Sequence, residues 1–153
     1  KDYHQKFNNP SKNLKVTGFV NEKDIKLYYS AADIVVLPYR TMMSSSGPLS
    51  LAFTFKRPVL LSNKLKAYTE SKDFNEALRS SKLSDKDIFF ALNKKNFFKK
   101  INSANIRKLT KFSEIMREKR DYINIVDRYI PFLLNKKGLK LENWNYLKAV
   151  NEL

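Results

Sequence analysis

The feature that most constrains the fold is a continuous apolar run, Ile34 to Leu37, which follows Asp33 and ends at Pro38. A strand with one solvated face alternates apolar and polar residues, whereas a strand of a parallel sheet is covered on both faces and is apolar throughout. The unbroken run therefore predicts a buried strand of a parallel sheet.

A second apolar run, 58–61, follows after a segment that is long enough for one helix. We expect this helix to begin at Gly47-Pro48, because proline is tolerated in a first turn and Ser46 is a natural cap. It should end near Arg57. Two strands joined by one helix form a β-α-β unit.

Another strand and helix are predicted upstream. Residues 14–19 alternate between apolar and polar, which predicts a short strand, and Asn21 is a suitable cap for a helix over 22–32. The predicted fold class is therefore α/β: a Rossmann-like half with a parallel β-α-β-α-β core and helices on both faces. A helical C-terminal segment should follow, with helices at 73–78, 85–93, 97–112 and 115–133, the last kinked or ended by Pro131.

Composition narrows the function classes. The 153 residues suit one domain, and a hydrophobic content of 42% argues against wholesale disorder. Cysteine is absent, which excludes disulfides and thiolate metal sites, and the single histidine, His4, cannot form a histidine cluster. No apolar run approaches the ~20 residues that cross a bilayer. These features fit a protein of a reducing compartment, either soluble or at a membrane surface.

The charge indicates anionic partners. Lys and Arg number 30 against 15 Asp and Glu, a formal net charge of +15. Such a chain attracts nucleic acid, anionic lipid headgroups or phosphorylated substrates. Nucleic acid is the partner that we expect least, because no helix-turn-helix or RNA-recognition signature is present. The segment 97–112 pairs apolar residues with Lys99 and Lys100; this is ordinarily a solvated face, but it would also suit an anionic membrane surface.

Five segments occur in a fixed order between residues 16 and 63. They are Thr17-Gly18-Phe19-Val20, Tyr28 to Asp33, Ile34 to Tyr39, the loop and helix 40–55, and Lys56 to Ser62. In order and spacing they resemble the C-terminal domains of the group 1 (family 4) retaining glycosyltransferases, which have the GT-B fold. The resemblance implies that residues 1–134 form a partial GT-B C-terminal domain, which binds the nucleotide-sugar donor, and that residues 135–153 form a helical extension.

The same resemblance implies that much of the enzyme lies elsewhere. The family's N-terminal domain, and the basic pair that holds the donor diphosphate, would precede Lys1, so we expect a fragment that meets its N-terminal domain in cis or in trans. Because the reaction takes place between the two domains, the fragment alone is expected to be inactive.

The resemblance places the donor diphosphate on the loop after the first apolar strand. We expect its ligands to be Arg40, Ser44, Ser45, Ser46 and Gly47. A helix N-terminus offers free backbone N–H groups and partial positive charge, although Pro48 removes one such group. Arg40 would follow the carboxyl end of the strand, where open α/β sheets bind ligands. Without the resemblance, the serine run is only a good cap and a flexible loop.

Other family positions follow from the same alignment of motifs. Gly18, Phe19 and Val20 would line the nucleobase side of the site. Two family glutamates, one near the sugar and one on the ribose, fall on Met43 and Leu51, so both are lost. No residue of this stretch matches a catalytic position. The resemblance implies no metal and no cofactor other than the nucleoside-diphosphate sugar substrate.

The predicted function is thus donor binding in a hexosyltransferase-type glycosyltransferase, whose acceptor, lipid-linked or polysaccharide, is unknown. The first alternative is a non-catalytic partner or binding subunit derived from a GT-B protein, which the loss of both glutamates favours. The second is a polyanion-binding domain, suggested by the charge alone. The expected location is cytoplasmic, peripheral at the inner membrane face.

Overall fold

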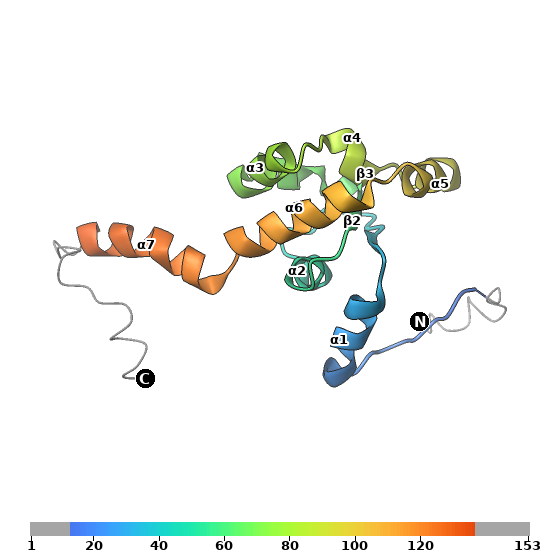
Figure 1. Cartoon of the computed structure of the whole chain (residues 1–153), viewed down its shortest axis with the longest axis horizontal. Helices are drawn as coiled ribbons and strands as arrows, with labels where there is room; N and C mark the ends of the chain where they lie inside the picture. Colours follow the sequence, from blue (N-terminus) through green and yellow to red (C-terminus); the bar gives the residue numbers. More distant parts are fainter. Residues whose placement is uncertain (1–12, 137–153) are drawn as a thin grey trace.

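The computed structural model describes residues 13–136, which form a small parallel sheet surrounded by helices (Figure 1). The elements in chain order are α1 (Glu22–Ala31), β1 (Val35–Leu37), α2 (Gly47–Thr54), β2 (Val59–Ser62), the 3-10 helix η2 (Asn63–Glu70), α3 (Lys72–Ser80), α4 (Asp85–Ile88), β3 (Phe89–Phe90), α5 (Lys94–Asn102), α6 (Ile106–Lys119) and α7 (Tyr122–Lys136). None of these helices is both long enough and apolar enough to cross a membrane.

The three strands lie in the order β1-β2-β3, and both neighbouring pairs are parallel. Val36 lies opposite Leu60, and Leu61 lies opposite Phe89. All four residues of β2 are buried, as expected for a strand that is covered on both faces. The α/β class, the two apolar strands and the helix that connects them are confirmed.

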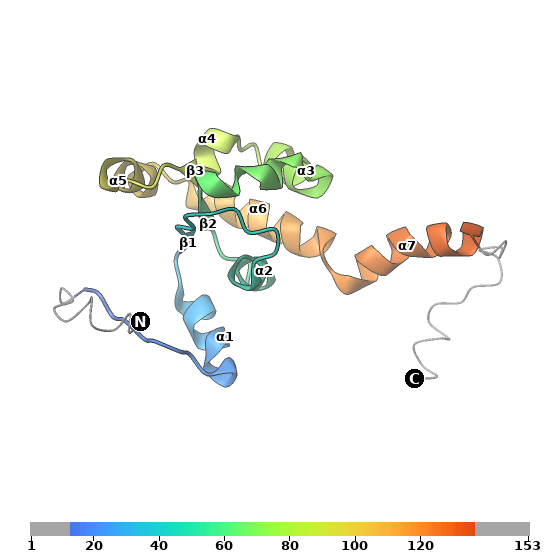
Figure 2. The ribbon, with the colours of Figure 1, turned by 180° about the vertical axis from the view of Figure 1, so that it is seen from behind.

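Helices lie against both faces of the sheet. Successive side chains of a strand point to opposite faces, so Phe89 and Phe90 contact helices on different sides. On one face, the Phe89 ring stacks on Phe74 of α3 with centroids 6.1 Å apart, and Phe74 meets Phe112 of α6 edge-on at 4.9 Å. On the other face, Phe90 lies 5.4 Å from Phe97 of α5. Helix α6 also packs between α2 and α3, and these contacts form the core (Figures 1 and 2).

The prediction of a strand over residues 14–19 is wrong. Residues 13–20 form neither strand nor helix, residues 13–19 are exposed, and both views show the segment running away from the sheet. An alternating pattern stabilises a strand only when the backbone groups pair with a neighbour, and these residues pair with no described strand. As a result, β1 is an edge strand of the described sheet rather than its centre.

The third strand of the sheet lies where a helix is predicted. Within the helix predicted over 85–93, α4 ends at Ile88 and Phe89–Phe90 form β3. A short apolar run does not distinguish a buried strand from a buried helix; here the pairing with β2 decides. The three strands of the described sheet are therefore β1, β2 and β3, with α2 between the first two and η2, α3 and α4 between the last two.

The helix boundaries after residue 94 also differ from the prediction. The expected helix over 97–112 is divided into α5 and α6, and Asn105, whose Oδ1 accepts a bond from Lys108 N at 3.0 Å, caps α6. Pro131 lies inside α7 and does not end it. The predicted extension, 135–153, lies outside the described residues except for 135 and 136, and His4 lies outside them too.

Candidate functional site

Because the strands are parallel, their carboxyl ends meet at one edge of the sheet. From this edge, Leu37 leads into the loop 38–46 and Ser62 leads into η2. Open α/β sheets bind their ligands at this edge. Four of the five predicted diphosphate ligands lie in the loop between β1 and α2, and Gly47 is the first residue of α2, so the fold places all of them on this side of the sheet.

Three hydrogen bonds fix the loop 38–46. Ser62 Oγ donates to the carbonyl of Tyr39 at 2.6 Å, and the Tyr68 hydroxyl donates to the carbonyl of Met43 at 2.7 Å. The hydroxyls of Tyr39 and Ser46 lie 3.0 Å apart. Burial raises the pKa of Tyr68 above its ordinary value, which keeps its hydroxyl protonated and able to donate.

Ser46 points inward. Its side chain is only 6% exposed, and its Oγ accepts a bond from Leu49 N at 3.2 Å as the N-cap of α2. With Tyr39 as its other partner, this hydroxyl is used within the protein. Leu49 N is occupied and Pro48 has no N–H, so the N–H of Gly47 is the free donor in this first turn. The cap role predicted for Ser46 is confirmed, and its side chain does not face the loop surface.

The other four predicted ligands face solvent. Arg40, Ser44, Ser45 and Gly47 are exposed, and a Cβ added at Gly47 would meet no atom within 4 Å beyond its own chain neighbours and the backbone of its own helix. The segment 38–54 contains no Asp, Glu or Lys, so Arg40 is its single charged side chain. The loop thus presents one guanidinium, two hydroxyls and one backbone N–H on an open surface.

The residues predicted for the nucleobase side lie apart from this loop. Gly18 has a left-handed φ of 66°, and Phe19 is 93% exposed. They precede α1, which spans about 15 Å, and it is the other end of α1 that approaches α2. There Tyr29 donates to the Pro48 carbonyl at 3.0 Å. The structure therefore does not bring Gly18, Phe19 and Val20 to the loop 40–47.

Neither position of the lost glutamates carries a carboxylate. Met43 lies in the loop with its side chain 43% exposed, and Leu51 is half-buried on α2. Sequence reasoning missed one Asp-x-Asp spacing, at Asp85 and Asp87 of α4. No group of three His, Cys, Asp or Glu side chains that could hold a metal was found among residues 13–136.

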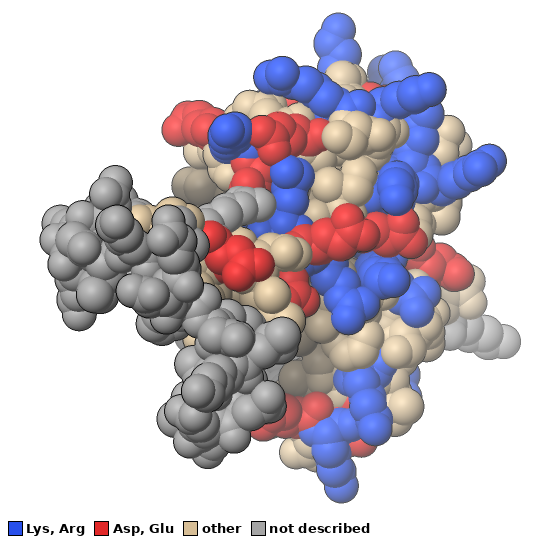
Figure 3. All heavy atoms as spheres, turned by 60° about the vertical axis from the view of Figure 1, so that its left-hand side comes forward, with Lys and Arg blue, Asp and Glu red and all other residues tan. Residues whose placement is uncertain are grey.

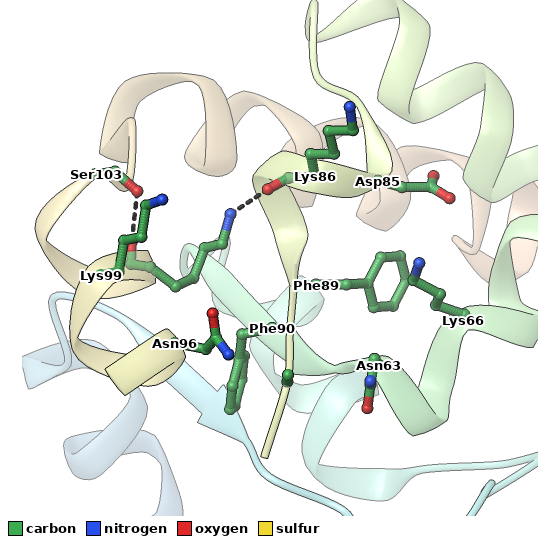
Figure 4. A pocket seen from close by; sticks show the side chains of 11 residues that line it. Asn63, Lys66, Asp85, Lys86, Phe89, Phe90, Asn96, Lys99 and Ser103 are labelled. Atoms are coloured by element: carbon green, nitrogen blue, oxygen red, sulfur yellow. Dashed lines mark hydrogen bonds between the residues drawn. The ribbon is translucent and has the colours of Figure 1, made fainter. Parts of the chain in front are cut away.

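Sequence reasoning also missed a basic pocket beside β3, on the opposite side of the sheet from β1 (Figure 4). It has a volume of about 490 Å³, and its lining includes Lys66 of η2, Lys86 of α4, and Lys99 and Lys100 of α5. Asp85 is the one carboxylate in the lining. The signal is faint in the sequence, because the four lysines are spread over 35 residues in three separate elements.

Two charged side chains around this pocket, Lys100 and Asp87, form hydrogen bonds within the protein. Lys100 Nζ donates to the carbonyl of Lys86. Asp87 Oδ2 accepts bonds from both N and Oγ of Ser84, each at 2.7 Å. These bonds lower the pKa of Asp87, and the charges of Lys100 and Lys108 lower it further. Lys66, Lys86 and Lys99 form no ion pair with any described carboxylate.

The chain matches no family model, no curated protein and no solved structure. Its function must therefore be inferred from the residues themselves and from the geometry of the carboxyl edge. That edge combines a well-fixed loop, a helix N-terminus and the guanidinium of Arg40.

Proposed function

We propose that this chain is the donor-binding part of a glycosyltransferase, and that it binds the diphosphate of a nucleoside-diphosphate sugar on the loop 40–47. One observation supports this most. The parallel unit β1-α2-β2 puts the exposed residues Arg40, Ser44, Ser45 and Gly47 at the carboxyl edge of the sheet. This is where open α/β sheets bind nucleotides.

The chemistry of the loop suits a diphosphate. A guanidinium such as that of Arg40 makes two parallel hydrogen bonds to phosphate oxygens, which are stronger than neutral ones. The N–H of Gly47 and the positive end of α2 add to this attraction. Ser44 and Ser45 supply hydroxyl donors. In this proposal Ser46 only positions the loop, because its own hydroxyl is bonded to Tyr39 and Leu49.

The proposed reaction needs a second domain. Sugar transfer with retention of configuration requires an acceptor site and catalytic groups, which the resemblance assigns to a GT-B N-terminal domain. We propose that this domain acts in cis or in trans, that residues 1–134 form the donor domain, and that the chain binds donor but does not turn it over. A cytoplasmic site at the inner membrane face belongs to the same proposal.

Amide NMR spectra recorded during titration with UDP, GDP or ADP test the proposal. At millimolar nucleotide we expect shifts at Gly47 and Arg40 for at least one of the three. Arg40→Ala should weaken binding about tenfold, the worth of one charge-assisted bond. Arg79→Ala, which removes an exposed arginine of α3, is the control and should leave the affinity unchanged. Silence at Gly47 with all three nucleotides would overturn the proposal.

A second candidate is a non-catalytic subunit derived from a GT-B protein. It is favoured by the missing carboxylates at Met43 and Leu51, and by the separation of Phe19 from the loop 40–47. This candidate predicts no nucleotide binding and stable co-purification with a second chain. The titration therefore discriminates between the two.

A further inference from the structure

The two sides of helix α5 differ sharply in chemistry. One side borders the basic pocket. The other borders an apolar groove of about 560 Å³, lined mainly by Val36, Pro38, Phe90, Leu92, Phe97 and Phe98. Phe98 is 51% exposed and Leu92 is 40% exposed. An apolar groove beside a row of cations is a surface of amphipathic character.

Helix α5 is held firmly enough to present both sides together. Phe97 packs on Phe90 of β3 with ring centroids 5.4 Å apart and on Phe98 at 5.7 Å. Asn93 caps the helix, since its Oδ1 accepts a bond from Asn96 N at 2.9 Å. Phe97 therefore anchors the helix to the sheet, while the neighbouring Phe98 remains available to a partner.

Three lysines of this surface, Lys66, Lys86 and Lys99, form no ion pair within the described residues. The ion pairs among the described residues lie within or between α3 and α6: Lys72 with Glu76 in α3, Lys111 with Glu114 in α6, and Lys119 of α6 with Glu76 of α3. On the face shown in Figure 3, basic and acidic side chains likewise lie beside one another. Around the basic pocket, Lys66, Lys86 and Lys99 have no such partner, so their charge is available to an external anion (Figure 4).

We propose that α5 and its two flanks dock this protein on the surface of an anionic lipid bilayer. The lysines contact headgroup phosphates, and Phe98 and Leu92 enter the boundary between headgroups and acyl chains. A helix with lysines on one side and aromatic residues on the other lies in the plane of this boundary. The inference is independent of nucleotide binding, because it uses neither Arg40 nor the residues 44–47.

A bilayer accounts for more of this surface than a nucleic acid does. Phosphates of either ligand would satisfy the lysines, but only a lipid offers a hydrocarbon region to the groove beside them. Each lysine near an anionic bilayer strengthens binding about fivefold. The unpaired lysines therefore suffice for measurable docking when the apolar side chains add their own contribution.

Co-sedimentation with vesicles tests the docking. The 153-residue chain should bind vesicles of phosphatidylglycerol mixed with phosphatidylcholine, and bind pure phosphatidylcholine vesicles at least about tenfold more weakly. The double variant Lys66→Gln, Lys99→Gln should lose about 25-fold in affinity, at fivefold per lysine. The matched control is Lys72→Gln, Lys111→Gln, which removes the same charge from ion-paired positions of α3 and α6 and should keep its binding within about twofold.

The apolar part is tested by fluorescence. In a chain with Trp144→Phe, the variant Phe98→Trp should shift its emission to the blue on anionic vesicles, and brominated lipid should quench it. Circular dichroism establishes that each variant is folded. Equal binding to both vesicle types, an equal loss in the control variant, or no shift at position 98 would each overturn the proposal. Tighter binding to RNA homopolymer that depends on Lys99 but not on Phe98 would assign the surface to nucleic acid instead.

Discussion

The hydroxyl oxygens of Tyr39 and Ser46 lie 3.0 Å apart and close the loop between β1 and α2. At one end of this link, the Tyr39 carbonyl accepts a bond from Ser62 of β2; at the other, Ser46 caps α2. The loop is thereby joined to the strand and the helix that flank it in space. Its shape is set by the fold before any ligand arrives.

Ser46→Ala should lower the free energy of unfolding by about 1–2 kcal/mol, because it removes a helix cap and leaves the Tyr39 hydroxyl without its partner. Urea denaturation followed by circular dichroism measures the change. Ser44→Ala is the control: Ser44 is exposed, so its loss should change stability by less than about 0.5 kcal/mol. Equal effects of the two substitutions would contradict the structural role of Ser46.

Two lysines occupy left-handed positions that usually hold glycine. Lys56 and Lys82 have φ of 53° and 55°, and each follows the C-cap residue of a helix, α2 and α3 respectively. In each case the amide of the next residue donates to a carbonyl five residues back, Arg57 N to the Ala52 carbonyl at 2.8 Å and Leu83 N to the Leu78 carbonyl at 2.9 Å, a Schellman arrangement.

Lys56→Gly and Lys82→Gly should each stabilise the protein by about 0.5–1 kcal/mol. Glycine removes a left-handed strain of about 1–2 kcal/mol and costs part of that in unfolded-state entropy. Thermal unfolding reports the gain as a higher Tm. Lys111→Gly, inside α6, should instead cost about 1 kcal/mol. A loss of stability at positions 56 and 82 would show that these turns tolerate lysine without strain.

Phe74 joins the helices to the sheet, since its ring contacts Tyr68, Phe89 and Phe112. Phe74→Ala should cost about 3–5 kcal/mol, the price of a large cavity in a packed core. Chemical denaturation is the measurement, and Phe19→Ala, at a position 93% exposed, is the comparison that should stay within about 0.5 kcal/mol. A small effect at Phe74 would mean that the aromatic core is loosely packed.

Asp87 gives stability a dependence on acid pH. Its pKa is lowered in the folded protein, chiefly by the bonds from Ser84, so its contribution is present above the ordinary value of 3.8. It is lost as the pH falls from there through the lowered folded-state pKa. Asp87→Asn should therefore destabilise the protein at neutral pH, and the difference from the parent chain should shrink as the pH falls below 3.8 through the lowered pKa. Ser84→Ala should make the free energy of unfolding depend less on pH over the same acid range. If the variant and the parent chain instead show the same pH dependence, the bond between Ser84 and Asp87 is not its cause.

The parts of the fold that follow from local chemistry were predictable. The apolar run at Val35–Leu37 identified a parallel strand, and Ser46 identified the start of α2. The strand at 14–19 failed because alternation says nothing about whether a neighbour is present. The apolar pair Phe89 and Phe90 suits a buried strand as well as a buried helix. These residues form a strand because Phe89 pairs with Leu61 of β2, which is far away in sequence.

In the candidate site too, features that depend on local sequence were predictable and features that depend on distant neighbours were not. The exposure of Arg40 and Gly47 at the carboxyl edge follows from their place after a parallel strand. The burial of Ser46 does not, since it depends on the direction of the Tyr39 side chain and on the packing of β2. The basic pocket is the extreme case: Lys66, Lys86 and Lys99 meet only through the tertiary fold.

Strand β1 leaves the backbone groups of one side unpaired within the described sheet. Such an edge is a template on which strands of other molecules can add, and long flat edges lead to fibrils. Here the edge is three residues long and is followed at once by Pro38, which has no N–H to donate. An added strand would gain few backbone bonds there, so this edge is a poor template for self-association.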